Sequence, residues 1–197
     1  MKFSQKDEEK YILEHFKGKT DGRFLDIGAY TGVEFSNTRA LALLGWSGVL
    51  VEPSPKCFPI LFKNYEGNKK VTFINLAIGS HCGETEFYDS GGAVATTIKE
   101  SYERWKGIQL DFEKITVPMI DVARLLQLVG SSFEFISIDT EGMDLEILNQ
   151  LAEFKFCDAS MLCVEYGNNA ERMFELLIPR GYKPIYSNDE NIIFIKK

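Results

Sequence analysis

The sequence predicts an α/β fold built on a doubly wound sheet that is mostly parallel and closes with an antiparallel hairpin. Three observations lead to this prediction. Short apolar runs alternate with amphipathic stretches along most of the chain. The first apolar run ends in a turn that contains two glycines, Gly28 and Gly32. The last two apolar runs are separated only by a short polar turn around Asn188 and Asp189.

Composition limits the alternatives. A chain of 197 residues with 45% hydrophobic residues suggests one domain over 1–197 with a substantial core. The formal charge of −7 argues against nucleic acid as a partner, and no apolar run is long enough to span a membrane. The polar N-terminus lacks a signal peptide pattern, and the four cysteines form no Cys-x-x-Cys pair. These features favour a cytoplasmic protein with reduced thiols; the oligomeric state is not predicted.

The first elements follow from periodicity and from glycine stops. A charged helix over about 5–17 precedes the polar run that ends at Gly22. The apolar residues 23–27 predict the first strand, and 34–44 predict a helix that buries Phe35 and Leu44. Residues 48–51 predict the second strand, which ends before two prolines.

The middle of the chain is less regular. We expect a helix over 57–65 and a third strand over 71–78. A lid-like insertion over about 80–120 follows, in which 84–88 and 115–120 suggest strands and 99–106 a short helix. Gly91 and Gly92 in this insertion fit a loop that closes over substrate.

The alternation then resumes. We expect a helix over 122–129 capped by Asp121, a strand over 133–138, a helix from about 142, a strand over 159–164 and a helix over 170–178. Residues 182–186 and 191–196 predict the closing hairpin.

Acidic residues follow four of the predicted parallel strands: Asp26, Glu52, Asp139 and Glu165. The carboxyl ends of parallel strands meet at one edge of a sheet, where such folds bind their ligands. The spacing Gly-x-x-x-Gly is not the dinucleotide fingerprint, so a nicotinamide-dependent oxidoreductase is disfavoured. An acid beside a glycine turn suits a ligand with a cationic or hydroxylated part.

Individual residues at this edge suggest contacts with a nucleoside. Glu52 follows the second strand, where an acid accepts hydrogen bonds from a ribose diol. Ser54 either adds a hydrogen bond or caps the next helix. Ala77 leaves room for an adenine ring, and Asn75 either contacts it or caps the strand end.

Several motifs together resemble the FkbM-family methyltransferases. They are Asp26-Ile27-Gly28-Ala29-x-x-Gly32-Val33, Ser36-Asn37-Thr38, Gly45-Trp46-Ser47-Gly48, Glu52-Pro53-Ser54-Pro55 and Ile138-Asp139-Thr140-Glu141-Gly142-Met143-Asp144. The resemblance runs from about residue 24 to residue 167. It implies a seven-stranded Rossmann-like sheet and methylation, usually of a hydroxyl oxygen, with S-adenosylmethionine as cofactor. One departure is that Tyr30 and Thr31 stand where the family's turn usually has Asn and a variable residue.

The cofactor site expected from this resemblance and from the strand ends has eleven residues. They are Asp26, Gly28, Ala29, Tyr30, Gly32, Glu52, Pro53, Ser54, Asn75, Ala77 and Asp139. The acceptor would be a small molecule with a hydroxyl group, such as a sugar or a polyketide-like metabolite. A methyltransferase-like binding or scaffold module is the alternative, because of Tyr30 and Thr31.

The catalytic candidates are Asp139 and Glu141, with Asp139 preferred. Methyl transfer to a hydroxyl needs a base for its proton, and a carboxylate with a raised pKa serves well. The competing interpretation is that Asp139 and Thr140 only cap the following helix. A divalent metal on Asp139, Glu141 and Glu165 is a third option, and we assign none. His81 is an alternative base, and Tyr102 and Trp105 either line the acceptor pocket or pack the insertion onto the sheet.

Overall fold

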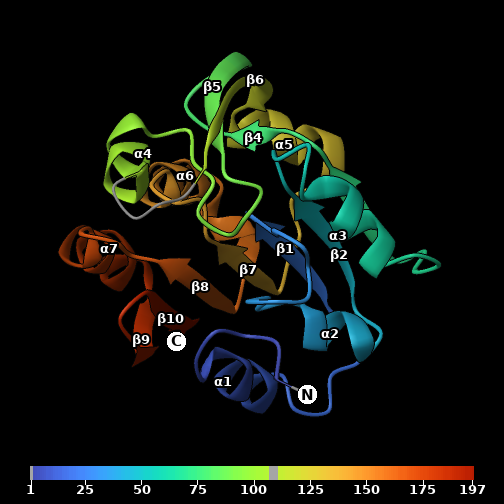
Figure 1. Ribbon diagram of the computed structural model, residues 1–197. Coiled ribbons are helices and arrows are strands. Elements are labelled where there is room, and N and C mark those ends of the chain that lie inside the picture. The colour runs from blue at the N-terminus through green and yellow to red at the C-terminus, as the bar shows by residue number, and fades with distance from the viewer. Residues whose placement is uncertain (1, 107–110) are drawn as a thin grey trace.

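The computed structural model describes residues 2–106 and 111–197, and a seven-stranded sheet forms its centre (Figure 1). The strand order is β3-β2-β1-β7-β8-β10-β9. The bounds are β1 Arg23–Ile27, β2 Ser47–Val51, β3 Val71–Ile74, β7 Phe135–Ile138, β8 Met161–Glu165, β9 Tyr182–Ser187 and β10 Asn191–Lys196. Strands β3 to β8 in this order pair in parallel, whereas β10 pairs antiparallel with both β8 and β9. The predicted doubly wound mixed sheet with a closing hairpin is confirmed.

Three strands of the middle region form a second sheet, in the order β4-β6-β5. These are β4 Ala77–Ile78, β5 Gly83–Asp89 and β6 Glu113–Ile120. The prediction of one continuous strand over 71–78 is therefore wrong. The Asn75 side chain donates to the carbonyl oxygens of Glu52 and Pro53, at 2.8 and 3.3 Å, where the chain leaves the main sheet. Residues 107–110 of the predicted insertion lie outside the described residues.

The helices lie between the strands, mostly as the periodicity predicts. Their bounds are α1 Glu8–His15, α2 Arg39–Leu43, α3 Phe58–Asn64, α4 Lys99–Lys106, α5 Val122–Val129, α6 Asp144–Glu153 and α7 Ala170–Leu177, with short 3₁₀ helices η1 Lys155–Asp158 and η2 Ile178–Arg180. Asp121 caps α5 as predicted, because its carboxylate accepts from the Arg124 amide at 2.7 Å. No helix in the described ranges is both long and apolar enough to cross a membrane.

The helix predicted over 34–44 is much shorter in the structure. The backbone at Phe35 has a φ of +59°, which interrupts a right-handed helix. The Ser36 hydroxyl then accepts from the amide of Arg39 at 3.1 Å, so that α2 begins only there. Phe35 and Leu44, which we expected to be buried, are 42% and 50% exposed.

The sheet is covered on both faces. Apolar residues of α5, α6 and α7, such as Leu125, Leu148 and Met173, pack on one face. Those of α1, α2 and α3, such as Ile12, Leu41 and Leu61, pack on the other. Because alternate strand residues point to opposite faces, Asp26, Ser137 and Asp139 share the side that faces α1 and α2. These three polar side chains thus lie together on one face of the sheet, beside an apolar core.

Candidate functional site

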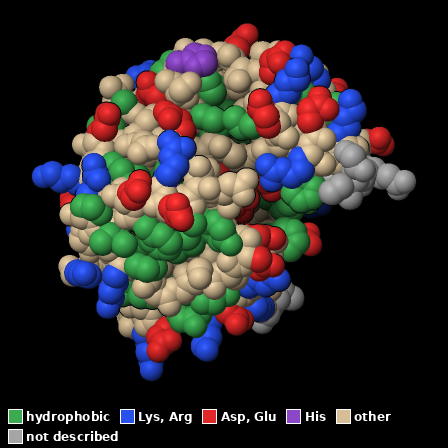
Figure 2. Space-filling view, turned by 90° about the vertical axis from the view of Figure 1, so that its left-hand side faces the viewer, with side chains coloured by type: hydrophobic (Ala, Val, Ile, Leu, Met, Phe, Trp, Pro, Cys, Tyr) green, Lys and Arg blue, Asp and Glu red, His purple; other side chains and the backbone are tan. Residues whose placement is uncertain are grey.

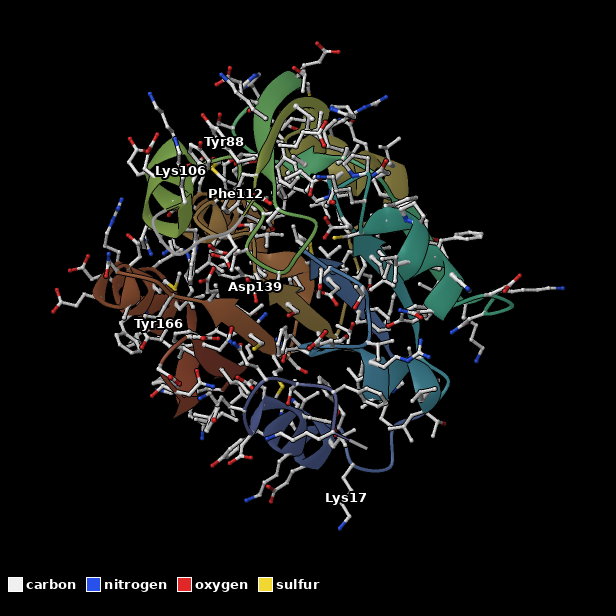
Figure 3. The ribbon with its side chains drawn as sticks, in the orientation of Figure 1. Lys17, Tyr88, Lys106, Phe112, Asp139 and Tyr166 are labelled. Atoms are coloured by element: carbon white, nitrogen blue, oxygen red, sulfur yellow. The ribbon has the colours of Figure 1, made fainter. Side chains whose placement is uncertain are left out.

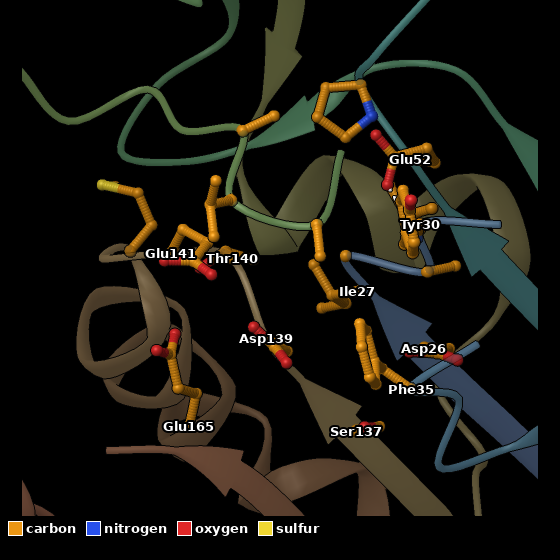
Figure 4. A pocket seen from close by; sticks show the side chains of 18 of the residues that line it. Asp26, Ile27, Tyr30, Phe35, Glu52, Ser137, Asp139, Thr140, Glu141 and Glu165 are labelled. Carbon is orange, nitrogen blue, oxygen red and sulfur yellow. Dashed lines mark hydrogen bonds between the residues drawn. The ribbon is translucent and has the colours of Figure 1, made fainter. Parts of the chain in front are cut away.

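A cavity of about 470 Å³ lies at the carboxyl ends of β1, β2, β7 and β8. Eight carboxylates line it, whereas Arg104 is the single Lys or Arg among the described lining residues. The acids are Asp26, Glu34, Glu52, Asp139, Glu141, Glu165, Asp189 and Glu190. Figure 4 shows Glu52 and Tyr30 on one side of this space, Glu141 and Glu165 on the other, and Asp139 between them. The four predicted strand-end acids are therefore brought together.

The turn after β1 depends on Gly28. Its φ is +90°, and a Cβ atom there would lie 1.6 Å from the carbonyl oxygen of Asp139. Glycine at this position therefore permits the close contact between the β1 turn and the end of β7. The amides of Gly28 and Ala29 both donate to the Val51 carbonyl at 3.0 Å, which fixes the turn over β2.

Glu52 is held by two backbone donors. Its Oε2 accepts from the Tyr30 amide at 2.8 Å and its Oε1 from the Ser54 amide at 2.7 Å. Burial raises the pKa of Glu52 to about 7, against the lowering effect of these hydrogen bonds. The carboxylate is thus fixed in orientation with a lone pair of each oxygen still available to a ligand.

Asp26 belongs to β1, lies beside Ser137 of β7 and lines the cavity. Its Oδ2 accepts from the Thr38 hydroxyl at 2.5 Å, and its side chain is almost fully buried. Burial raises the pKa of Asp26 to about 6, while the bond from Thr38 lowers it. An anion in this position is stabilised by a cationic ligand group.

Most of the predicted cofactor residues line the cavity, namely Asp26, Gly28, Ala29, Tyr30, Glu52, Pro53, Ala77 and Asp139. Gly32, Ser54 and Asn75 are not among the lining residues. A Cβ at Gly32 would meet the side chains of Leu61 and Tyr65, so this glycine serves packing. The Ser54 hydroxyl accepts from the amides of Lys56 and Cys57. Of the two roles predicted for Ser54, the structure thus shows the capping of the segment that leads into α3.

Asp139, Glu141 and Glu165 form an acidic cluster at the other side of the cavity. Each offers one carboxylate oxygen, and these atoms lie within 4.8 Å of one another. Burial, and then the neighbouring acids, raise the pKa of Asp139 well above its usual range. Burial raises the pKa of Glu141 to about 7, and burial together with Asp139 raises that of Glu165. Such crowding favours retention of protons at neutral pH.

The loop after β7 is organised by Asp144. Its Oδ1 accepts from the amide and the hydroxyl of Thr140, at 2.7 and 2.9 Å, and its Oδ2 from the Gly142 amide at 3.0 Å. No cap bond from Asp139 or Thr140 to α6 is found in the described structure; Met143 is the N-cap residue. The capping interpretation of Asp139 is therefore wrong, and its side chain faces the cavity (Figure 4).

The middle region contributes one wall. Residues 92–95 and Thr97 line the cavity with Arg104 and Trp105 of α4, and the Thr96 hydroxyl donates to the Glu141 carbonyl at 2.8 Å. Tyr102 instead stacks on Tyr88, with ring centroids 4.2 Å apart. Of the two roles that we considered for these aromatic residues, Trp105 lines the cavity, whereas Tyr102 packs within the middle region. Figure 3 shows Tyr88 and Phe112 above Asp139, which lies near the centre of the molecule.

His81 lies away from these groups. It is exposed and does not line the cavity, and its Nδ1 lies 3.3 Å from the Ser80 hydroxyl. The structure gives no support to His81 as the base.

Sequence reasoning missed several lining residues: Gln5, Phe35, Asn37, Arg104, Ser137 and Glu190. They come from the N-terminal segment, the loop before α2, α4, β7 and the closing hairpin. The motif Ser36-Asn37-Thr38 was a usable signal, although its chemistry was not assigned.

Several solved structures that resemble this chain are methyltransferases. A crystal structure of methyltransferase FkbM from Methylobacillus flagellatus KT matches with a TM-score of 0.58 and 10% identity, covering 89% of this chain and 44% of that one. Precorrin-6y C5,15-methyltransferase from Geobacter metallireducens GS-15 matches with a TM-score of 0.53 and 13% identity, covering 100% and 94%. The N-terminal domain of human METTL16 in complex with SAH gives 0.51 and 13%, covering 94% and 65%.

These similarities establish a Rossmann-like fold of the class I methyltransferase type. This chain spans less than half of the FkbM structure that it matches. No curated protein sequence matches it significantly. The model of the methyltransferase FkbM domain matches residues 26–184, which include every strand-end acid of the cavity. The chain therefore belongs to the FkbM family of methyltransferase domains.

Proposed function

We propose that this chain uses S-adenosylmethionine to methylate a hydroxyl oxygen of a small molecule. The observation that carries the proposal is that one cavity joins Glu52, a fixed acceptor for a ribose diol, to the acidic cluster around Asp139. Family membership supports methyl transfer, and a similar fold has been solved with SAH. A volume of about 470 Å³ is in the range of sites for ligands of this size.

The residues of the β1 and β2 ends fit the cofactor. Glu52 offers two oxygens to a pair of hydroxyls, and the buried carboxylate of Asp26 suits a cationic group. The bound cofactor would supply an activated methyl group on a positively charged sulfur. Ala77 and Ile78 line the same cavity and give an apolar surface for a purine ring.

We assign the removal of the acceptor's proton to Asp139. Its side chain points into the cavity between the two groups of acids, and no hydrogen bond to it is found within the described ranges (Figure 4). Because burial and the nearby carboxylates raise the pKa of Asp139, its ionised form is a stronger base than an exposed aspartate. Glu141, with a pKa of about 7, is the second candidate.

The charge of the cavity supports a small acceptor that is not a polyanion. Eight lining carboxylates against one guanidinium would repel phosphate groups. Basic side chains on the face drawn in Figure 2 are scattered among acidic ones and form no continuous patch. A nucleic acid backbone needs clustered Lys and Arg, so a neutral or cationic hydroxylated molecule fits better.

Thermal unfolding with S-adenosylmethionine, S-adenosylhomocysteine and NADH in parallel tests the cofactor. A ligand at about 100 times its Kd stabilises a protein by about 2.7 kcal/mol, which for this size raises Tm by about 5–10 °C. We expect this shift with both adenosyl ligands and none with NADH. No shift with either adenosyl ligand would overturn the proposal. Methyl transfer to a panel of hydroxylated molecules, followed with radiolabelled cofactor, then separates an enzyme from a binding module.

A further inference from the structure

Asn37 carries a buried polar atom without a partner in the cavity wall. The residue lies in the loop between β1 and α2, is 7% exposed and lines the cavity. Its Nδ2 donates to the Ser137 hydroxyl at 3.3 Å, while its Oδ1 has no hydrogen-bond partner among the described residues. An unpaired buried carbonyl oxygen is costly, and most such groups in native proteins are paired.

The surroundings of Asn37 hold this oxygen in place. The hydroxyl of Thr38 is bound to Asp26, and that of Ser36 accepts from the Arg39 amide. Phe35, immediately before, has the strained φ of +59°. The loop is thus fixed on both sides of Asn37, which is one of the residues that line the cavity.

The neighbouring charge indicates what would pair with the oxygen. Ser137, the hydrogen-bond partner of Asn37, lies opposite Asp26 in the register of β7 and β1. Asn37 and Asp26 therefore present two hydrogen-bond acceptors, one of them a carboxylate, to the same part of the cavity. A ligand ammonium group can donate to both, whereas a ligand carboxylate would be repelled by Asp26.

We propose that Asn37 Oδ1 and Asp26 together bind the α-ammonium group at the amino-acid end of the cofactor. This inference rests on the proposed function and adds Asn37 as a residue that determines cofactor specificity. The site then distinguishes cofactors that keep the amino-acid end from nucleosides that lack it. The bond from Asn37 Nδ2 to the Ser137 hydroxyl leaves the amide oxygen as the end available to the ligand.

Calorimetric titration with two ligands tests the inference. S-adenosylhomocysteine has the amino-acid end, and 5′-methylthioadenosine has the same nucleoside without it. Loss of one hydrogen bond to a charged group should weaken S-adenosylhomocysteine binding to Asn37→Ala by about 10- to 100-fold. Binding of 5′-methylthioadenosine should change less than about twofold. Asn37→Asp keeps an acceptor oxygen and should bind S-adenosylhomocysteine at least as well as Asn37→Ala does.

Asn191→Ala is the matched control. Asn191 is also buried with an unpaired Oδ1, but it does not line the cavity. We expect this variant to bind both ligands like the wild type, and circular dichroism shows whether each variant is folded. Should Asn37→Ala weaken both ligands equally, or neither, the inference is wrong. Weaker binding by Asn37→Asp than by Asn37→Ala would indicate a contact with the cofactor's carboxylate and would also overturn it.

Two further outcomes distinguish failure of this inference from failure of the proposed function. If the wild-type protein binds 5′-methylthioadenosine and not S-adenosylhomocysteine, the ammonium contact is refuted while a nucleoside site remains. If it binds neither ligand, the cofactor itself is refuted, and the inference fails with it.

Discussion

The two sides of the cavity hold their carboxylates in different ways. Glu52 and Asp26 each accept hydrogen bonds from neighbouring protein groups, at 2.5 to 2.8 Å. Asp139 and Glu165 have no side-chain hydrogen bond to a backbone donor in the described ranges. One oxygen of each, together with one of Glu141, lies within 4.8 Å of the others. The first pair is oriented by hydrogen bonds, whereas the second group is distinguished by the short distances between its carboxylates.

This difference separates recognition from proton transfer. A carboxylate that is fixed by hydrogen-bond donors keeps its direction, which suits selection of a ligand. Crowded carboxylates have raised pKa values, so the ionised form of each is a stronger base than an exposed carboxylate, which suits proton transfer. The Asp144 carboxylate accepts from the amides of Thr140 and Gly142 and so holds the loop that carries Asp139 and Glu141.

The largest effect should come from Asp139→Asn. The amide has the same shape but cannot accept a proton, so kcat should fall about 10²- to 10⁴-fold. Affinity for S-adenosylhomocysteine should stay within about threefold, because Glu52 and Asp26 are untouched. Steady-state kinetics and calorimetric titration of the same preparation measure both quantities.

The exposed Glu153 provides a control for this experiment, as Glu153→Gln should leave kcat unchanged. Full activity of Asp139→Asn would remove Asp139 as the base. Glu141→Gln is then the next variant, since burial gives Glu141 a pKa of about 7.

A smaller effect, and one confined to binding, is expected for Glu52→Ala. The change removes the acceptor for a ribose diol and leaves the amides of Tyr30 and Ser54 unpaired. Binding of S-adenosylhomocysteine should weaken about 10- to 100-fold. Binding of 5′-methylthioadenosine should weaken equally, in contrast to Asn37→Ala, because both ligands contain the ribose.

Glu34→Ala is the matched control for Glu52, since Glu34 also lines the cavity but is exposed at its edge. It should bind both ligands like the wild type. Equal affinities for the wild type and Glu52→Ala would refute the ribose contact.

Most of the strands were predictable because a short apolar run in the local sequence marks each of them. Residues 23–27 form β1 with the predicted bounds, and 99–106 form α4 with the predicted bounds. The helix over 34–44 was not, because Phe35 adopts a left-handed conformation that its residue type disfavours. The strand over 71–78 divides because the Asn75 side chain binds carbonyl oxygens of another segment, a tertiary contact.

The site was predictable to the extent that strand ends define it. Asp26, Glu52 and Asp139 are acids directly after apolar runs, and parallel pairing brings them to one edge. Glu190 and Gln5 reach the cavity from the closing hairpin and the N-terminal segment. Their placement depends on how these segments fold back over the sheet, which local pattern does not encode. Asn37 stood in a recognised motif, but only the structure reveals its unpaired oxygen.

The smallest predicted effect concerns stability without ligand. Burial raises the pKa of Asp26 to about 6 from an ordinary 3.8, so the folded protein binds this proton more tightly than the unfolded chain does. Its contribution to the free energy of unfolding therefore decreases as pH rises from about 4 to about 6 and stays low above that. In Asp26→Asn this contribution is absent, and the asparagine oxygen can still accept from Thr38.

Asp26→Asn should therefore be more stable than the wild type at pH 8, by about 1–3 kcal/mol, and should lose this advantage near pH 4.5. Urea unfolding without ligand at intervals between these pH values measures the difference. Asp158→Asn, at an exposed carboxylate, should follow the wild type throughout. Parallel profiles for Asp26→Asn and the wild type would refute the raised pKa. A gain in stability with a loss of cofactor affinity would mean that Asp26 is kept charged and buried for its ligand, at the expense of the empty protein.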